Sequence, residues 1–295
     1  MKTAILLVSH GTVASLDELP AFLTSIRRGH PASPELLAEV ERRYRAIGGV
    51  SPLAAINERI ARKLAERTGL PTWAAARHGS PALRGVLETM VAAGIERVLV
   101  VPLGQHSVPI YEAAVRETAA DLPLQIATTP SWGQDPSLLG LYASKIEHAL
   151  ASAGTTARVL LSAHSLPQAV IDAGDPYERE VRSAAESIAR LANVDNTRIV
   201  FQSQGMSQGP GGRPMPWLGP TLDDALREAA ADGETHVIVA PVGFLADHVE
   251  ILYDLDIEAR ARAEALGLGF SRTESLNDDN AFVAVLERLV HELQG

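Results

Sequence analysis

The sequence predicts an α/β fold built from two similar doubly wound, Rossmann-like halves, each with a parallel sheet. Short apolar runs alternate with amphipathic helical stretches along the chain. The apolar runs are continuous rather than alternating, which is typical of parallel strands covered by helices on both faces. The chain also repeats part of itself, since Ser80–Gly104 aligns without a gap on Gly219–Gly243.

Strands and helices follow one another in a regular order. The expected strands are Ala4–Ser9, Thr72–Ala76, Arg97–Leu103, Leu124–Thr128, Arg158–Ala163, Arg198–Gln202, His236–Val242 and Gly269–Glu274. The main helical patterns are Ser33–Ile47, Ala54–Thr68, Pro81–Ala93, Ser137–Ala153, Asp175–Leu191, Thr221–Ala231 and Ala281–Leu293. Alternation of this kind favours βαβ units.

The internal repeat divides the chain into halves. Gly94 and its counterpart Gly233 each stand where a helix should end, as expected for a glycine after the last helical residue. We therefore expect one domain over residues 1–148 and a second over 149–295, with the last helix packing back on the first half. A cleft between the strand ends of two such halves is the expected ligand site.

Composition excludes several functions. The net charge is −10 and aromatic residues make up 4% of the chain, so binding to nucleic acid is not expected. The absence of cysteine excludes cysteine-ligated iron–sulfur clusters and thiol nucleophiles, and no permanently bound cofactor is expected. No apolar run reaches the ~20 residues that a membrane helix needs. We expect a cytoplasmic protein without an integral membrane segment.

The segment Pro241–Glu258 combines a strand with an acidic helix. Glu250, Asp254 and Glu258 are four residues apart, which on an α-helix stacks their carboxylates along one stripe. Asp247 lies nearly one turn earlier, where the strand opens. Like charges at this spacing destabilise a helix, so the stripe is either a solvated face or a path for cations.

Histidines follow two equivalent strands. The segments ILLVSHG and VLLSAHS place His10 opposite His164. With an ordinary pKa near ~6.5, an imidazole at a strand's carboxyl end suits proton transfer at neutral pH. His164 is thus a candidate base or a turn-stabilising histidine, and His10 a metal ligand or a cap. The nearby serines suggest a hydrolase only weakly, because no G-x-S-x-G motif is present.

Further residues are candidates for ligand contacts. Arg27 and Arg28 could bind a carboxylate through paired hydrogen bonds, or form a solvated basic turn. Ser51 lies in a glycine turn, and Arg77 follows a strand. Trp217 is expected as either a cleft wall or core packing, and the Gly/Pro-rich stretch Gly205–Pro216 before it as a rim or lid.

These motifs together resemble the ferrochelatase family, over nearly the whole chain. The matching segments are RRYRAIGGVSPL, LLSAHSLP with DAGDPY, PWLGPT, PVGFLADHVEILYDLDIE and ESLNDDNAF. The resemblance implies insertion of Fe²⁺ into a porphyrin in haem biosynthesis, with His164 as the catalytic histidine and Glu250 as its partner. It also implies that both ligate the metal, that Asp254, Glu258 and Asp247 conduct metal or protons, and that their helix contains a π-type widening.

Within the family, the chain is most similar to the short, water-soluble bacterial type that acts on coproporphyrin III. That type often has a tyrosine metal ligand where this chain has His10. Arg27, Arg28, Ser51, Arg77 and Trp217 are then expected to contact porphyrin. The other readings are a protoporphyrin IX ferrochelatase, a cobalt or nickel chelatase, and a non-catalytic tetrapyrrole carrier. Porphyrin and Fe²⁺ are the expected partners, with transient contacts to neighbouring haem-pathway enzymes, and the expected state is a monomer.

Overall fold

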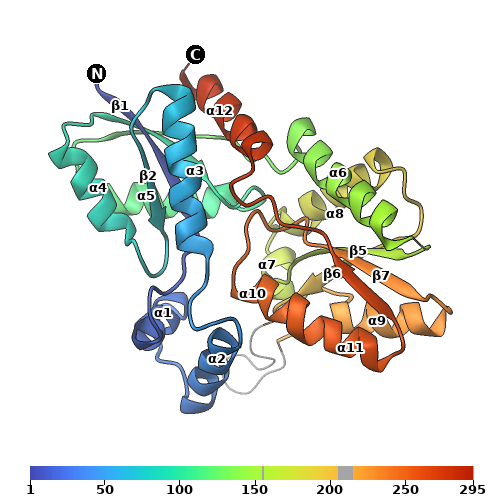
Figure 1. Cartoon of the computed structure of the whole chain (residues 1–295). Coiled ribbons are helices and arrows are strands. Elements are labelled where there is room, and N and C mark those ends of the chain that lie inside the picture. Colours follow the sequence, from blue (N-terminus) through green and yellow to red (C-terminus); the bar gives the residue numbers. More distant parts are fainter. Residues whose placement is uncertain (155, 205–214, 295) are drawn as a thin grey trace. The chain divides into compact units, whose positions relative to one another are not determined.

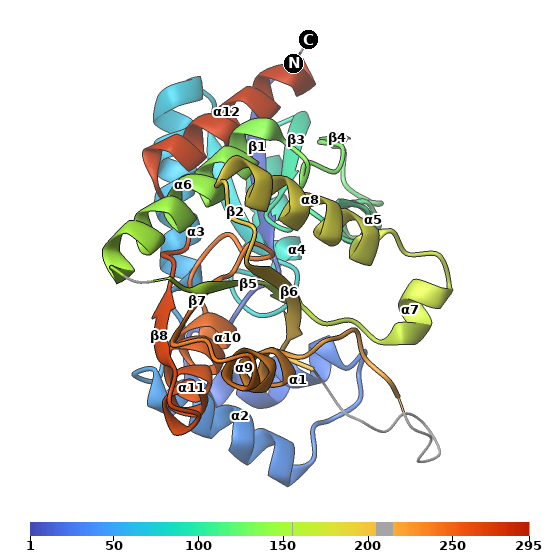
Figure 2. The ribbon, with the colours of Figure 1, turned by 90° about the vertical axis from the view of Figure 1, so that its right-hand side faces the viewer.

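The computed structural model describes residues 1–154, 156–204 and 215–294. Its contacts divide the chain into two units (Figures 1 and 2). Unit 1 comprises Met1–Trp132, Ala246–Val249 and Asn277–Gly295, and unit 2 comprises Gly133–Leu245 and Glu250–Leu276. Both units are therefore assembled from segments that are distant in sequence.

Unit 1 contains a parallel sheet with the strand order β2-β1-β3-β4. The strands are β1 (Thr3–Ser9), β2 (Thr72–Ala76), β3 (Arg97–Pro102) and β4 (Gln125–Thr128). Alternate residues of β1 point to opposite faces. Ala4, Leu6 and Val8 pack in one core with α4 (Leu83–Ala92) and α5 (Val108–Thr118). Contacts with α3 (Leu53–Thr68) and α12 (Asn280–Gln294) complete the unit (Figure 1).

Short elements follow β1 in unit 1. They are the 3₁₀ turn η1 (Leu16–Glu18) and the helices α1 (Leu19–Ile26) and α2 (Pro34–Ala46). Their small core contains Val13, Leu19, Phe22 and Tyr44. The Ser33 hydroxyl accepts a hydrogen bond from the Leu36 backbone N–H, which caps the start of α2.

Unit 2 contains a second parallel sheet with the order β6-β5-β7-β8. Its strands are β5 (Arg158–His164), β6 (Thr197–Gln202), β7 (His236–Ala240) and β8 (Gly269–Arg272). The main core joins the sheet to α9 (Leu222–Ala231), α10 (Val249–Leu252) and α11 (Arg260–Ala265). Its remaining helices are α6 (Pro136–Ala153), α7 (Gln168–Asp172) and α8 (Tyr177–Leu191).

The two units share one topology, which confirms the predicted pair of Rossmann-like parallel sheets. The order β2-β1-β3-β4 becomes β6-β5-β7-β8 when each strand is replaced by its counterpart in the repeat. Even a loop contact recurs, because the Ala76 N–H donates to the Pro81 carbonyl and the Phe201 N–H donates to the Pro220 carbonyl. Gly94 and Gly233 adopt the expected left-handed conformation after α4 and α9.

The division between the units differs from the one expected at residue 148. It falls after Trp132, because α6 packs against α8 and β7 and so belongs to unit 2. The last helix, α12, lies in unit 1, where it contacts α3 and β3. The short segment Ala246–Val249, which includes the first residue of α10, also belongs to unit 1, although β7 before it and the rest of α10 after it belong to unit 2.

All eight expected strands are present in the described part of the chain, within a few residues of the expected ends.

The acidic helix is different from a regular α-helix. After α10 the chain forms the π-helix η3 (Asp254–Ala259), in which the Glu258 N–H donates to the Tyr253 carbonyl. The expected α-helical stacking of three carboxylates is therefore wrong, and the π-type widening implied by the family resemblance is confirmed.

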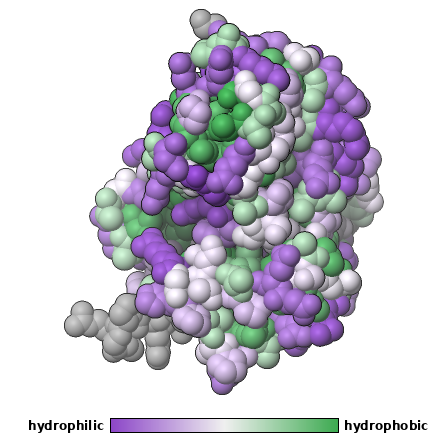
Figure 3. All heavy atoms as spheres, turned by 90° about the vertical axis from the view of Figure 1, so that its left-hand side faces the viewer, coloured by the Kyte–Doolittle hydropathy of each residue, from purple (hydrophilic) through white to green (hydrophobic). Residues whose placement is uncertain are grey.

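Hydrophobic and hydrophilic side chains are both present on the surface. On the face drawn in Figure 3, hydrophobic side chains gather in separate groups edged by hydrophilic ones. Among the helices of the described residues, none has the combination of length and apolar character that crossing a bilayer requires.

Candidate functional site

His164 and Glu250 form the centre of the candidate site, within unit 2. His164 is the last residue of β5, and Glu250 lies in the first turn of α10. The His164 Nε2 and Glu250 Oε2 atoms are 3.6 Å apart, and the two side chains are 35% and 32% exposed. The structure thus brings together the two residues that the sequence analysis paired, at the carboxyl end of a central strand.

Hydrogen bonds fix the orientation of His164. Its Nδ1 lies within hydrogen-bond distance of the Ser165 carbonyl, so Nδ1–H is the donor and Nε2 faces Glu250. The Tyr177 hydroxyl donates to the His164 carbonyl at 2.9 Å. The Ser165 hydroxyl donates to the Leu218 carbonyl at 2.9 Å, which holds the turn after β5.

The pKa of His164 is raised. Burial of the ring acts to lower this pKa, but the Glu250 carboxylate, the Ser165 carbonyl and the more distant Asp254 carboxylate outweigh burial. The imidazole and the carboxylate can therefore share a proton. A group of this kind accepts a proton readily at neutral pH.

Two residues at the end of β6 connect this strand to the acidic segment, and the sequence analysis missed them. The Gln202 side-chain amide donates to the Glu250 carbonyl at 3.1 Å, and the Ser203 hydroxyl donates to Asp254 Oδ2 at 2.7 Å. In the sequence, their only signal is that they lie at the end of a predicted strand. The structure adds that β6 is the neighbour of β5 and that Gln202 is in register with His164.

The acidic residues of unit 2 differ in exposure. Asp254 is only 8% exposed and is held by Ser203, whereas Glu258 is exposed. Asp256, which the sequence analysis did not single out, is paired with Arg272 through two hydrogen bonds of 2.7 and 2.9 Å. The acidic segment therefore offers one fixed, buried carboxylate and one exposed carboxylate beyond Glu250.

Asp247 has a different setting from the other predicted acids. It lies in unit 1, where its Oδ2 accepts a hydrogen bond from the Asn277 amide at 3.0 Å. Its backbone N–H donates to the Asn277 Oδ1 at 2.8 Å. This reciprocal pair connects the segment Ala246–Val249 to the segment that begins at Asn277.

Two histidines of unit 1 lie side by side. The rings of His10 and His78 have centroids 5.1 Å apart. His10 is exposed, whereas His78 is half-buried and its Nδ1 is 2.7 Å from the Ser25 hydroxyl. Burial, and to a lesser extent the Arg77 charge, lowers the pKa of His78 to about 4, so its ring is neutral near pH 7.

The residues of unit 1 that were predicted to contact the porphyrin differ in exposure. Arg28 and Arg77 are exposed, and the Arg27 guanidinium donates to the His30 carbonyl at 3.2 Å. Ser51 is only 3% exposed, and its hydroxyl accepts a long hydrogen bond of 3.4 Å from the Leu53 N–H at the start of α3. The arginines are accessible to a ligand in this structure, whereas Ser51 supports a helix start.

Trp217 is half-buried and pairs with Pro167 in an isolated β-bridge. The Leu218 N–H donates to the Leu166 carbonyl at 2.9 Å, so the segment after the predicted loop is fixed beside the turn that carries His164. Of the predicted rim or lid Gly205–Pro216, residues 205–214 lie outside the described residues.

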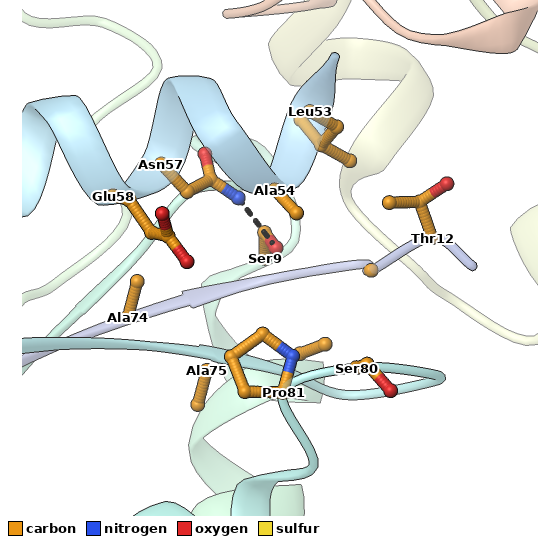
Figure 4. A pocket seen from close by; sticks show the side chains of 12 residues that line it. Ser9, Thr12, Leu53, Ala54, Asn57, Glu58, Ala74, Ala75, Ser80 and Pro81 are labelled. Atoms are coloured by element: carbon orange, nitrogen blue, oxygen red, sulfur yellow. Dashed lines mark hydrogen bonds between the residues drawn. The ribbon is translucent and has the colours of Figure 1, made fainter. Parts of the chain in front are cut away.

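A small pocket of unit 1 lies under the start of α3 (Figure 4). The Asn57 amide donates to the Ser9 hydroxyl at 2.9 Å across it. Alanines and Pro81 form much of its lining, and Glu58 is its one charged residue. It therefore lacks the cations that would bind a carboxylate-bearing ligand. Within the described residues, no group of three or more His, Asp or Glu side chains is arranged to hold a metal ion.

Comparison with known proteins identifies relatives over the full length. A family model described as ferrochelatase matches residues 2–294. A protein named ferrochelatase in Herpetosiphon aurantiacus is 35% identical, with 98% of this chain and 98% of that protein aligned. A protein named coproporphyrin III ferrochelatase in Anoxybacillus flavithermus is 33% identical, with 97% of this chain and 94% of that protein aligned.

Among solved structures, SirB from Bacillus subtilis with Fe³⁺ is similar in fold. Its TM-score is 0.59 at 16% sequence identity, with 99% of this chain and 96% of that chain covered. At this identity the likeness concerns the fold alone.

Proposed function

The chain belongs to the ferrochelatase family, whose members insert Fe²⁺ into a porphyrin in haem biosynthesis, and we propose that His164 is the residue that accepts the porphyrin's protons. The observation that carries this proposal is the 3.6 Å pair of His164 Nε2 and Glu250 Oε2 at the end of β5. Both iron and porphyrin are substrates, and no resident cofactor is part of the proposal.

The proton balance of the reaction explains why such a pair is useful. A porphyrin releases two N–H protons when one Fe²⁺ enters, so the enzyme must remove two positive charges for the two that arrive. Neutral His164 accepts a pyrrole proton at Nε2, because Nδ1–H is already donated to the Ser165 carbonyl. Glu250 stabilises the resulting imidazolium and can take the proton on, which frees Nε2 for the second.

The acidic segment supplies the next acceptors. Ser203 holds the Asp254 carboxylate in a buried position, and Glu258 is exposed to water. We propose that these carboxylates conduct protons outward or hydrated metal inward, with Glu250 at the inner end. Asp247 stays a weaker candidate for this path, because its carboxylate is bound by Asn277.

Coproporphyrin III is the proposed porphyrin. It carries four propionates whereas protoporphyrin IX carries two, so it gains more from accessible guanidinium groups. Arg28 and Arg77 are exposed and Arg27 is part-exposed, and these are the proposed propionate ligands; Trp217 is a proposed wall. Relatives named coproporphyrin III ferrochelatase support this choice. Ser51 is buried at the start of α3, so it is not among the proposed propionate ligands.

The porphyrin is identified by anaerobic Fe²⁺ insertion into coproporphyrin III and protoporphyrin IX, measured side by side. We expect a higher kcat/KM with coproporphyrin III. A preference for protoporphyrin IX would reject the proposed substrate while keeping the enzyme class. Binding of both porphyrins without turnover of either would indicate a carrier.

The role of His164 is tested by His164→Ala. We expect insertion to fall by at least about 100-fold, as for loss of a proton acceptor, while porphyrin binding is retained. His148→Ala is the matched control, since His148 is an exposed histidine on α6 of the same unit. A His164→Ala variant that keeps near-full turnover would contradict the assignment.

We also propose that the enzyme acts in the cytoplasm as a monomer. The acidic composition and the lack of any sequence feature that demands a partner subunit support this state. Light scattering of the purified protein tests it: a mass near 31.4 kDa is expected, and twice that mass would reject it.

A further inference from the structure

The π-helix η3 is attached to both outer strands of the unit 2 sheet. The Ser203 hydroxyl, one residue past the end of β6, donates to Asp254 Oδ2. Two residues further along the helix, Asp256 pairs with Arg272, the last residue of β8. Because the strand order is β6-β5-β7-β8, the two attachments lie at opposite edges of the sheet.

The Arg272–Asp256 pair uses the whole guanidinium group. Nε donates to Asp256 Oδ1 at 2.7 Å, and Nη2 donates to Oδ2 at 2.9 Å. The remaining Nη1 donates to the Thr273 carbonyl at 3.0 Å. The Arg272 side chain is 13% exposed and that of Asp256 is 28% exposed, so water screens this pair less than a surface pair. A planar fork of this kind fixes direction as well as distance, which a lysine does not.

Arg260 adds a backbone attachment to the same strand. Its Nε donates to the Asp256 carbonyl at 3.2 Å, and its Nη1 donates to the Phe270 carbonyl at 3.3 Å. The guanidinium group also lies over the Phe270 ring, 5.0 Å from its centroid. This contact holds the backbone of the helix near β8, whereas Arg272 holds the Asp256 carboxylate itself.

Two attachments on opposite sides fix the rotation of the helix. Residues two apart point to nearly opposite sides, because one turn takes about 3.6 residues in an α-helix and more in a π-helix. The contacts agree with this, since Asp254 reaches the end of β6 and Asp256 reaches β8. Either attachment alone would let the segment turn about that point, whereas the two together prevent it.

The ion pair also favours the π form over an α-helix. In η3 the Glu258 N–H donates to the Tyr253 carbonyl, five residues earlier. A change to α-helical hydrogen bonds would wind the segment more tightly and turn Asp256 relative to Asp254. The Arg272 fork would then no longer meet both carboxylate oxygens of Asp256.

We propose that Arg272 is a positioning residue: by holding Asp256 at β8, it keeps η3 in its π form and keeps the Asp254 carboxylate at the end of β6. This inference rests on the proposed role of the acidic segment as an acceptor of protons or hydrated metal. Arg272 acts through Asp256 and contacts no substrate. Loss of the pair would let Asp254 leave the position in which Ser203 holds it.

Amide hydrogen exchange of the full-length protein tests the attachment. In Arg272→Met, a peptide covering residues 254–259 should exchange at least about tenfold faster than in wild type, because the Asp256 carboxylate is then no longer held. Arg158→Met is the matched control. Arg158 is a 14% exposed arginine at the start of β5, and it pairs with Asp232 and Glu234 instead of the acidic segment. Unchanged exchange of the peptide in Arg272→Met would overturn the proposal.

Anaerobic Fe²⁺ insertion tests the positioning role. In Arg272→Met, kcat per porphyrin-binding site should fall by at least about tenfold while KM for the porphyrin stays within about twofold, because the proposed propionate ligands are unchanged. Arg272→Lys, which keeps the charge, should restore part of kcat. Faster exchange with an unchanged kcat would overturn the positioning role. The assignment of His164 would then still stand, since His164→Ala tests it separately.

A second variant keeps the test valid if Arg272→Met does not fold. Asp256→Asn keeps the shape of the side chain and one acceptor oxygen, but it loses the charge and the second acceptor. Exchange of the same peptide should become about threefold faster, as for loss of one hydrogen bond, and kcat should fall with it. Exchange and kcat equal to those of the wild type would overturn the proposal.

Discussion

At the scale of single residues, the proton affinity of His164 depends on the groups that face its two ring nitrogens. The Ser165 carbonyl accepts a hydrogen bond from Nδ1–H, and Glu250 faces Nε2 at 3.6 Å. Because both side chains are only about one-third exposed, water screens their interaction less than on an open surface. The carboxylate therefore controls the proton affinity of the imidazole.

Replacing Glu250 with glutamine should change the pH dependence of activity. Glu250→Gln keeps the shape of the side chain but removes the negative charge that raises the pKa of His164. The acidic limb of the kcat profile, where His164 becomes protonated, should therefore move to lower pH, and maximal kcat should fall because Glu250 is itself proposed to act. Measurement of kcat from pH 5 to 9 decides this. A limb that stays in place would show that Glu250 does not tune His164.

The same pair has a predicted effect on stability. A raised pKa in the folded state stabilises the fold fully below the unfolded pKa of about 6.5, and this contribution is lost as pH rises through the raised value. The difference in unfolding free energy between wild type and Glu250→Gln should be larger at pH 6 than at pH 9. Chemical denaturation at both pH values measures it, and a larger difference at pH 9 would contradict the prediction.

Sequence reasoning identified His164 because it follows a strand and Glu250 because it belongs to an acidic stripe, and the likeness to a known family paired them. It did not identify Gln202 or Ser203, since their roles depend on which strand is the neighbour of β5. The burial of Ser51 could not be predicted from the sequence either, because a serine in a glycine turn can face a ligand or support a helix start.

At the scale of elements, the acidic segment is held by β6 as well as by its own helix. The chain passes from α10 through the π-helix η3 to α11, and Gln202 and Ser203 bind it at Glu250 and Asp254. A π-helix has poorer backbone geometry than an α-helix and commonly occurs at functional sites. The two side-chain hydrogen bonds thus stabilise a segment that is intrinsically less stable.

Ser203→Ala should loosen this segment. Loss of a hydrogen bond to a buried carboxylate costs about 1.5 kcal/mol, or roughly tenfold in local opening. Amide hydrogen exchange in a peptide covering residues 250–259 should accelerate by about that factor. Gln204→Ala is the control, because its amide donates to the Leu218 carbonyl and not to the acidic segment. Unchanged exchange in Ser203→Ala would show that β6 does not hold the segment.

Strand positions were predictable because parallel strands are continuous apolar runs. The π-helix was not predictable from periodicity, since the carboxylate spacing fits a regular α-helix equally well. Only the likeness to a known family pointed to it. The short helix α7 follows the proline of the SLP segment and has too few residues to show a period.

At the scale of the whole molecule, unit 1 is completed by distant segments. Asp278 binds Lys63 at 2.8 Å and Arg59 at 3.1 Å, both on α3. Arg67 of α3 pairs with Glu287 of α12, and Phe282 of α12 stacks with Trp132. These contacts attach the last segment of the described chain to the first domain.

Asp278→Asn should destabilise unit 1. Hydrogen bonds from Lys63 and Arg59 lower the pKa of Asp278, so its stabilising effect is present above its unfolded pKa and is lost as pH falls through the folded value. We expect a loss of about 1 kcal/mol at pH 7 and a smaller loss at pH 3, below the unfolded pKa of about 3.8. Thermal unfolding at both pH values measures it, with Asp17→Asn on η1 as a control. An equal loss at both would exclude the ion pairs as the cause.

The sequence repeat predicted two sheets of the same topology, because nine identities recur without a gap across one helix–strand unit of each half. It could not locate the division between the units. α6 is amphipathic and could cover either sheet, and only its contacts with α8 and β7 assign it to unit 2.

The discontinuity of unit 1 has a consequence for biosynthesis. Phe282 and Leu286 of α12 are fully buried in the folded protein, so unit 1 cannot complete its core until they have been translated. A ribosome adding about 5–20 residues per second needs several seconds or more to reach them after unit 1's first segment is made. During that interval the face of α3 that α12 covers is open, and we expect the nascent chain to depend on chaperones until the last helix emerges.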